Sequence, residues 1–200
     1  MKLYYSPGAC SLASHIMLHE VGLPFETERA DLRAKTTASG GDFRSVNPKG
    51  AVPTLMLDDG AVLTEGVAIM QYVADAAGAV ALVPAPGLAR ARVAEMLNYV
   101  ASEVHKTYSP LFRPGMTDEA KAAQLAMLDV KLGWLEGVLA DGRDYLTGAF
   151  SPADGYLFTV TNWSQGNGHD LARFPHIEAL RARVAARPAV QAAMRDEGLI

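Results

Sequence analysis

Cys10 is the only cysteine in the chain, and its place in the sequence suits a reactive thiol. A short β-prone run from Lys2 to Tyr5 and a Ser-Pro-Gly loop precede it, and an apolar pattern with helical spacing follows it. Free amides and the helix dipole at the start of a helix lower the pKa of a thiol and favour the nucleophilic thiolate. A lone cysteine is also commonly a small buried side chain, so both interpretations stay open. Without a second cysteine, a dithiol redox cycle inside the chain is excluded.

Two segments could present backbone groups to a ligand. Thr64-Glu65-Gly66 lies between a predicted strand and a predicted helix, so the amides of Glu65 and Gly66 are candidate donors to a carboxylate. Helix capping by Thr64 or Glu65 explains the same residues equally well. Val52-Pro53 precedes another predicted strand, and a cis bond there would turn the N–H and C=O of Val52 outward, where they could pair with a peptide. Because only about 5 to 6% of X-Pro bonds are cis, the sequence alone favours a trans turn.

A polar stripe follows one predicted helix in the middle of the chain. Asn98, Ser102 and His105 fall at i, i+4 and i+7, nearly opposite an apolar stripe. A solvent-exposed helix face would have the same pattern, and only the histidine, which can exchange a proton with a thiol near neutral pH, points to chemistry. Trp163 could supply an aromatic wall for an apolar ligand, although a core position is the commoner use of tryptophan.

Composition limits the classes of partner. Acidic residues outnumber basic ones by 22 to 18, which gives a net charge of -4, so nucleic acid is not expected as a partner. No membrane span or secretory signal is predicted, and a lone thiol suits a reducing compartment, so we expect the protein in the cytoplasm. No metal site is predicted, because we assign no metal-ligand spacing to His15, His19, His169 and His176.

Alternating strands and helices must position the candidate residues of the first part of the chain. Four strands are predicted, at Lys2 to Tyr5, Phe25 to Asp31, Thr54 to Leu57 and Ala61 to Leu63. One helix is predicted after Cys10, ending at Gly22, and another after Gly66. The Asp-Gly pair between the last two strands predicts a hairpin with two turn residues at positive φ, and Thr36 to Gly41 is predicted as a loop.

Only helices are predicted beyond a boundary near Leu82 to Leu88. One of them starts at the cap residue Thr117. Another starts at Ser151, with Pro at N1 and the Asp154 carboxylate placed to accept a hydrogen bond from the N-cap amide. The predicted fold is therefore an α/β unit, residues 1–80, followed by an all-α unit, residues 87–200.

Taken together and in order, five segments resemble the bacterial beta-class glutathione transferases. They are MKLYYSPGACSL (1–12), NPKGAVPTL (47–55), LTEGVAIMQY (63–72), ASEVHK (101–106) and EGLI (197–200). The resemblance covers nearly the whole chain. It implies a thioredoxin-like N-terminal domain with the element order βαβαββα, an all-helical C-terminal domain that contributes the electrophile site, and a homodimer.

The resemblance also implies glutathione contacts, residue by residue. Pro53 would be cis, and the main chain of Val52 would hold the cysteinyl part of glutathione like an added antiparallel strand. Glu65 and Gly66 would bind the γ-glutamyl end, with its carboxylate on the helix-start amides and its amine on the Glu65 side chain. Cys10 would point at the glutathione sulfur. The further implied contacts are Lys35, Asn98, Ser102, Glu103, His105 and Lys106.

The implied reaction is conjugation of glutathione to hydrophobic electrophiles, and the implied catalytic residues are Cys10 and His105. Helix-start amides and His105 would lower the pKa of the glutathione thiol, and the thiolate would attack an electrophilic carbon of a compound held near Tyr108 and Trp163. Glutathione is then a co-substrate, and no cofactor is expected. Cys10 could also form a mixed disulfide with glutathione, which would give thiol transfer or peroxide reduction.

Two alternatives keep other classes of function open. A non-catalytic carrier of the same fold would bind glutathione and apolar ligands without turnover. A protein-interaction module would have no affinity for glutathione. Turnover assays over several classes of electrophile separate the carrier from the enzyme.

Overall fold

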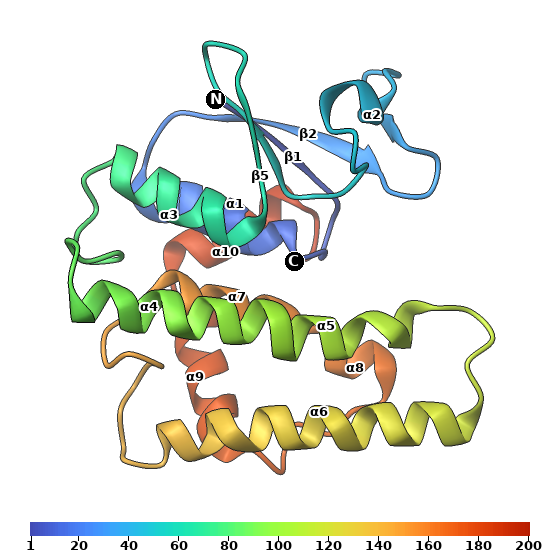
Figure 1. The fold of residues 1–200 in the computed structure, drawn as a ribbon, viewed down its shortest axis with the longest axis vertical. Coiled ribbons are helices and arrows are strands. Elements are labelled where there is room, and N and C mark those ends of the chain that lie inside the picture. The colour runs from blue at the N-terminus through green and yellow to red at the C-terminus, as the bar shows by residue number, and fades with distance from the viewer. The chain divides into compact units, whose positions relative to one another are not determined.

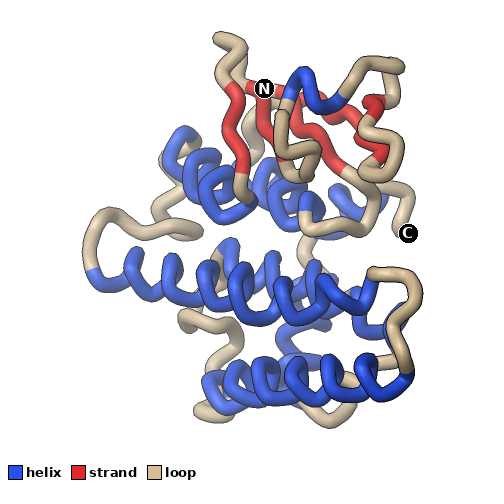
Figure 2. The backbone as a smooth tube through the Cα atoms, turned by 45° about the vertical axis from the view of Figure 1, so that its right-hand side comes forward, coloured by secondary structure: helices blue, strands red, loops and turns tan.

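The computed structural model describes residues 1–200, which form two compact units. The first contains Met1–Val83 and Ala186–Ile200, and the second contains Pro84–Ala185 (Figure 1). All named strands belong to the first unit, and the regular structure of the second is helical (Figure 2). None of the helices combines the length and the apolar character needed to cross a membrane.

A five-stranded mixed sheet forms the centre of the first unit, in the order β3-β2-β1-β4-β5 (Figure 1). Its strands are β1 (Lys2–Tyr5), β2 (Glu26–Asp31), β3 (Thr36–Thr37), β4 (Thr54–Met56) and β5 (Val62–Thr64). β1 runs parallel to β2 and antiparallel to β4, with Leu3 opposite Thr27 on one side and Leu55 on the other. The loop that leads to Cys10 therefore leaves from the middle strand of the sheet.

Three helices complete the element order that the resemblance implies, namely α1 (Ser11–Val21), α2 (Phe43–Val46) and α3 (Gly66–Ala76). Helices α1 and α3 pack side by side against the sheet (Figures 1 and 2). Because α1 is covered on several sides, every residue from Ser11 to Leu18 is buried, including His15. Gly22 ends α1 as predicted, since its φ is 69° and its N–H donates to the Leu18 carbonyl at 3.1 Å.

The last helix, α10 (Pro188–Asp196), belongs to the first unit, whereas the sequence pattern placed it in the helical domain. It packs against α1 and buries Val190 and Ala193. The Arg187 guanidinium donates to the Glu20 carboxylate at 2.6 and 2.8 Å, which attaches the start of α10 to the end of α1. An amphipathic pattern predicts that a helix is packed, but it does not identify the helix that it packs against.

The predicted hairpin of β4 and β5 is present, but its turn differs from the prediction. The loop runs from Asp58 to Gly60, and only Gly60 has a positive φ, of 85°. The Gly60 N–H donates to the Leu57 carbonyl at 3.0 Å, and the Leu57 N–H donates to the Ala61 carbonyl at 2.8 Å. This is a type I turn closed by a left-handed glycine, so the expectation of two positive φ values is wrong.

Part of the predicted loop from Thr36 to Gly41 is a strand. Thr36 and Thr37 form β3 by pairing with Asp31 and Ala30 at the end of β2. Two residues are too short a pattern for period-2 alternation to identify as a strand.

The second unit is built from consecutive helical segments. They are α4 (Leu88–Tyr99), η1 (Val100–His105), α5 (Lys106–Tyr108), η2 (Ser109–Phe112), α6 (Asp118–Leu139), α7 (Pro152–Thr161), α8 (Trp163–Asn167) and α9 (Pro175–Ala185). The segments from α4 to η2 follow one another without a break, and η1 is π-helical. Helix α6 starts at the predicted cap Thr117, whose hydroxyl accepts a hydrogen bond from the Ala120 N–H at 3.2 Å. Helix α7 is buried along its whole length, so the core of this unit surrounds it.

The start of α7 is the capping box that the sequence predicts. The fully buried Asp154 carboxylate accepts hydrogen bonds from the N–H and the hydroxyl of Ser151, at 2.8 and 2.9 Å. It also accepts one from the N–H of Leu146 at 2.8 Å, a contact that no local pattern indicates. Burial raises the pKa of Asp154 to about 6, although these hydrogen bonds act in the opposite direction. One carboxylate therefore holds both the start of α7 and the loop before it.

Candidate functional site

The first group of candidate residues surrounds the start of α1. Cys10 is the N-cap residue of α1 and is partly exposed. Its thiol donates a hydrogen bond to the Val52 carbonyl, with Sγ and O 3.2 Å apart. The Val52-Pro53 bond is cis, so the conformation that the resemblance implies is confirmed and the trans turn that the sequence alone favours is wrong. The structure thus brings the single thiol to the main chain of Val52.

Side chains hold the loop that precedes Pro53. The Thr54 hydroxyl donates to the Ala51 carbonyl at 2.9 Å, and the Lys35 ammonium donates to the Gly50 carbonyl at 2.8 Å. The N–H of Val52 donates to no other group of the chain. A peptide that added to this segment as an antiparallel strand would find that N–H available for pairing.

The second group lies at the start of α3. Glu65 is its N-cap residue and has a positive φ of 69°, which is uncommon for a residue with a side chain. Its exposed carboxylate pairs with the Lys49 ammonium at 2.6 Å, and the same ammonium donates to the Thr64 hydroxyl at 2.9 Å. A Cβ on Gly66 would lie 3.5 Å from the Pro53 side chain, so the helix start is close to the cis proline. The two backbone segments singled out in the sequence are therefore neighbours. Lys49, from the loop before Pro53, pairs with Glu65 although no sequence pattern indicated it.

His105 is the central candidate of the second unit. It ends the π-helical segment η1, and its Nδ1 lies 2.7 Å from the Tyr156 hydroxyl on α7. Burial, and to a smaller extent the nearby Lys106 charge, lowers the pKa of His105 to about 4. The imidazole is therefore neutral at pH 7. It can accept a proton or donate a hydrogen bond, but it supplies no positive charge to a thiolate.

The π-helical segment changes the polar stripe expected from the sequence. Its i to i+5 hydrogen bonding widens the turn, so the spacing that groups Asn98, Ser102 and His105 on one α-helical face does not hold through residues 100–105. The exposed Asn98 amide donates to the Ala94 carbonyl at 2.8 Å, and the Ser102 hydroxyl donates to the Asn98 carbonyl at 2.9 Å. Both side chains are thus bound to their own helix.

The two charged candidates beside them have different surroundings. The Glu103 carboxylate pairs with the Lys131 ammonium on α6 at 2.6 Å, which lowers the pKa of Glu103. Lys106 is exposed. Glu103 is therefore paired with Lys131, which the sequence did not indicate, whereas Lys106 lies at the surface.

An aromatic cluster stands beside His105. Trp163, the first residue of α8, meets the His105 ring edge to face at a centroid distance of 5.0 Å and the Phe112 ring at 5.3 Å. Phe112 is 57% exposed, so the cluster reaches the surface. Tyr108 contacts Trp163 at 5.7 Å, but it is fully buried and its hydroxyl is bound to Ser164. Trp163 and Phe112, rather than Tyr108, are the rings that an apolar ligand could touch.

A buried polar chain holds α8 in place. The Ser164 hydroxyl, bound to Tyr108, lies 3.2 Å from His169 Nδ1, and His169 Nε2 lies 2.8 Å from the Asp129 carboxylate. The order serine, histidine and aspartate resembles that of a hydrolase, but Ser164 is only 2% exposed, so a substrate cannot reach its hydroxyl. The chain instead fixes the helix that carries Trp163.

The residues predicted for the site thus fall into two sets. The first unit contains Cys10, Lys35, Val52, Pro53, Glu65 and Gly66. The second contains Asn98, Ser102, Glu103, His105, Lys106, Tyr108 and Trp163. Sequence reasoning missed Lys49, Tyr156 and Phe112, because each acts through a contact that has no periodic signature in the sequence.

Two family models match the chain. The glutathione S-transferase N-terminal domain matches residues 8–76, and the glutathione S-transferase C-terminal domain matches residues 99–188. Together they cover both units except for their ends. The element order β1-α1-β2-α2-β4-β5-α3, followed by helices, agrees with this pair of domains.

Similar proteins span the same length. Glutathione S-transferase GstA of Escherichia coli O157:H7 is 47% identical over 200 residues, which is 100% of both chains. Glutathione S-transferase GST-4.5 of Xanthomonas campestris pv. campestris is 36% identical over 208 residues, again 100% of both chains. The ternary complex of BphK, a bacterial GST, has a TM-score of 0.95 at 50% identity and covers 99% of this chain and 100% of its own. A sphingomonad glutathione S-transferase complexed with glutathione has a TM-score of 0.94 at 48% identity, with 100% of both chains covered.

Proposed function

The chain belongs to the glutathione S-transferase family and conjugates glutathione to electrophilic compounds; on this basis we propose which of its residues hold glutathione and how they act on its sulfur. Full-length relatives are named as transferases, so the non-catalytic carrier and the interaction module are not favoured. The observation that carries the proposal is the 3.2 Å contact between the Cys10 thiol and the Val52 carbonyl, beside the cis Pro53.

The cysteinyl residue of glutathione lies antiparallel to Val52. Its N–H donates to the Val52 carbonyl, and its C=O accepts from the Val52 N–H, which has no partner within the chain. The ligand N–H takes the carbonyl that the Cys10 thiol occupies in the structure. Binding therefore displaces the Cys10 thiol from the Val52 carbonyl and brings a second sulfur next to it.

The γ-glutamyl end of glutathione is a zwitterion, and the start of α3 offers one charge of each sign. The Glu65 carboxylate binds the ligand amine, while the Lys49 ammonium and the free amides at the start of α3 bind the ligand carboxylate. The Lys49 ammonium and the Glu65 carboxylate are 2.6 Å apart, so the amine and the carboxylate of one γ-glutamyl group can reach both. Both side chains of this ion pair are exposed, so the ligand groups that bind them replace water rather than buried hydrogen-bond partners.

Glu65→Ala is expected to release the protein from immobilised glutathione. Loss of a hydrogen bond to a charged group costs about 1.5 to 3 kcal/mol, which corresponds to a roughly 10- to 150-fold weaker affinity. Calorimetry with free glutathione measures this affinity independently of the retention experiment. Glu26→Ala removes another exposed carboxylate of the same unit and should change neither result. Equal affinity of Glu65→Ala and the unmodified protein would place the γ-glutamyl end elsewhere.

His105 acts on the glutathione sulfur as a neutral imidazole. With a pKa of about 4 it can take the thiol proton or donate its N–H to the thiolate at neutral pH, but it does not act as a resident cation. The Tyr156 hydroxyl, 2.7 Å from Nδ1, fixes the ring, and we assign Nε2 to the glutathione sulfur. Tyr156 is therefore a positioning residue.

His105→Phe should lower kcat/KM for conjugation about a hundredfold and change the affinity for glutathione little. Because the pKa of His105 lies near 4, the kcat/KM profile of the unmodified protein should show no ionisation of this imidazole between pH 5 and 8. Tyr156→Phe removes only the hydroxyl on Nδ1 and should give a smaller decrease in kcat without a change in KM. An inflection near pH 6.5 that is present in the unmodified protein and absent from His105→Phe would contradict the neutral imidazole.

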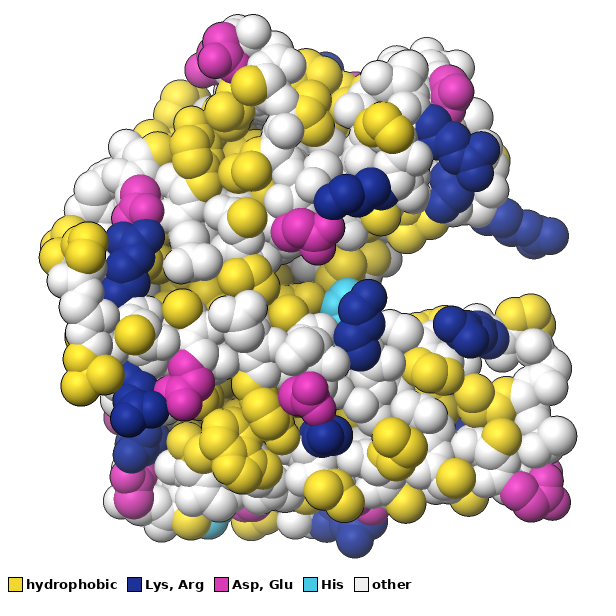
Figure 3. Space-filling model, in the orientation of Figure 1, with side chains coloured by type: hydrophobic (Ala, Val, Ile, Leu, Met, Phe, Trp, Pro, Cys, Tyr) yellow, Lys and Arg dark blue, Asp and Glu magenta, His cyan; other side chains and the backbone are white.

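The exposed cluster of Phe112 and Trp163 is the proposed contact for a small hydrophobic electrophile. Basic and acidic side chains are interspersed on the face shown in Figure 3, and the net charge is -4, so nucleic acid is not a proposed partner. The homodimer and the cytoplasmic location stay proposals, the first from the resemblance and the second from the single thiol.

A further inference from the structure

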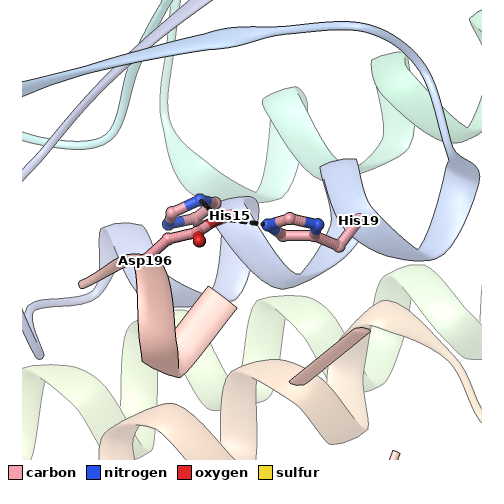
Figure 4. A group of neighbouring side chains, drawn as sticks. All are labelled: His15, His19 and Asp196. Carbon is pink, nitrogen blue, oxygen red and sulfur yellow. Dashed lines mark hydrogen bonds and ion pairs between the residues drawn. The ribbon is translucent and has the colours of Figure 1, made fainter. Parts of the chain in front are cut away.

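Two histidines of α1 and one aspartate of α10 point their polar atoms at one place (Figure 4). His15 and His19 are one helical turn apart, at i and i+4. Asp196 Oδ2 lies 2.9 Å from His19 Nε2 and 3.6 Å from His15 Nε2, and the three atoms all lie within 4.8 Å of one another. All three residues belong to the first unit.

The His15 ring is oriented by a buried carboxylate on its other side. His15 Nδ1 lies 3.0 Å from Glu197 Oε1, and both side chains are 0% exposed. The second oxygen of Glu197 accepts a hydrogen bond from the Gly8 N–H at 2.8 Å. A carboxylate only accepts hydrogen bonds, so His15 Nδ1 is the donor and carries the proton in the neutral ring. The lone pair of the neutral imidazole is then on Nε2.

His15 Nε2 is a buried polar atom without a hydrogen-bond partner. It faces Asp196 Oδ2, which is an acceptor as well, across 3.6 Å. Leaving a buried polar atom unsatisfied is unfavourable. An N–H on His19 Nε2 explains the 2.9 Å contact with Asp196 but leaves His15 Nε2 without a hydrogen-bond partner. A cation between the two acceptors satisfies both.

Two of the three separations between the candidate ligand atoms suit a metal ion. Ligand atoms around a tetrahedral zinc ion are about 3.4 Å apart, for bonds of about 2.0 to 2.2 Å, and the two observed separations of 2.9 and 3.6 Å lie on either side of that value. A histidine that donates its other N–H to a carboxylate is the usual arrangement of a metal-ligating histidine, and Glu197 supplies that carboxylate to His15. Phe25 packs edge-on against both imidazole rings. Asp196, with a side chain 50% exposed, gives access from solvent.

We propose that His15, His19 and Asp196 bind one divalent transition-metal ion, with zinc as the best match to two imidazoles and one carboxylate. The ion takes His15 Nε2, His19 Nε2 and Asp196 Oδ2, and a water completes the tetrahedron. The expectation of no metal-ligand spacing among the histidines is therefore revised for His15 and His19, because an i, i+4 pair places both rings on the same side of a helix. The ion joins α1 to α10 at the end of the chain.

Titration with zinc alone tests the site. The experiment uses the full chain with Cys10→Ala, so that the only thiol cannot bind the metal, after treatment with a chelator. Calorimetry should show one zinc ion per chain, and zinc should raise the melting temperature. His19→Ala and Asp196→Asn change partly exposed side chains and should each weaken zinc binding by more than about 100-fold, beyond what the loss of an outer partner costs. Glu197→Gln should weaken it about 10- to 100-fold.

His176→Ala is the matched control. His176 is an exposed histidine of the second unit, paired with Glu136, and its removal should leave zinc affinity unchanged. Cobalt in place of zinc should give the visible absorption of a tetrahedral site in the control and not in His19→Ala. Absence of zinc binding by the folded Cys10→Ala protein, or equal zinc affinity in the His19→Ala and His176→Ala variants, would overturn the proposal.

Discussion

Asp154→Ala is expected to lower the free energy of unfolding by about 3 to 5 kcal/mol. The substitution leaves three buried donors without an acceptor, namely the N–H and the hydroxyl of Ser151 and the N–H of Leu146. Each such donor costs about 1 to 3 kcal/mol, and relief of the burial of one carboxylate offsets part of the sum. Helix α7 is buried along its length, so the loss at its start affects the core of the second unit.

Urea unfolding followed by circular dichroism measures the effect, and an unchanged midpoint would contradict it. Asp154→Asn should be nearly as damaging, because Oδ1 accepts from Leu146 and Oδ2 from Ser151, whereas an asparagine has one acceptor oxygen and turns its NH2 toward the other donor. Asp141→Ala, which removes an exposed carboxylate of the same unit, should change the midpoint little.

The same carboxylate makes stability depend on pH. Its pKa is about 6 in the folded protein and near 3.8 for an unperturbed aspartate, so between these values the folded state binds more protons than the unfolded state. Stability contributed by Asp154 is therefore present in full below about pH 4 and is lost as the pH rises toward 6. We expect Asp154→Ala to lose this dependence of stability on pH. The unfolding midpoint at pH 4, 5, 6 and 7 measures it. A slope that persists in Asp154→Ala would assign it to another group.

The parts of the fold that could be predicted from sequence are those with a local physical cause. Gly22 ends α1 because a left-handed residue is needed there, and Ser151 starts α7 because its N–H and hydroxyl find an acceptor three residues later. The Asp-Gly pair does not determine the type of the turn at Gly60, since it suits both a two-residue and a three-residue loop. The sequence does not predict the π-helical segment at residues 100–105, because its residue types are also those of an α-helix.

The sequence indicates the main-chain segments of the candidate site, but not the side chains that meet across the fold. Val52-Pro53 and Glu65-Gly66 stand out as short segments at the ends of predicted elements. Tyr156 lies 51 positions from His105, and Glu197 lies 182 positions from His15. No periodicity connects residues at such separations, so these partners become visible only in the folded chain.

Cys10→Ala is expected to abolish thiol transfer, by about a thousandfold or more, while conjugation continues. In thiol transfer the Cys10 thiolate attacks the glutathione sulfur of a glutathionylated disulfide, an S–S bond forms between Cys10 and glutathione, and the other thiol leaves as a thiolate. A second glutathione thiolate then attacks the mixed disulfide, releases oxidised glutathione and restores the Cys10 thiolate. Conjugation uses only the glutathione sulfur, so it does not require Cys10.

We expect Cys10 to react only when glutathione is bound. The Cys10 thiol donates a hydrogen bond to the Val52 carbonyl at 3.2 Å. We expect glutathione to compete for the same carbonyl and to displace the Cys10 thiol from it, with the sulfur still at the start of α1. Assays with a glutathionylated disulfide and with a chromogenic electrophile separate the two reactions. Cys10→Ser, which retains a donor to the Val52 carbonyl, should lose thiol transfer and keep conjugation. Loss of both reactions in Cys10→Ser would assign Cys10 to conjugation, and retention of both would exclude it as the nucleophile.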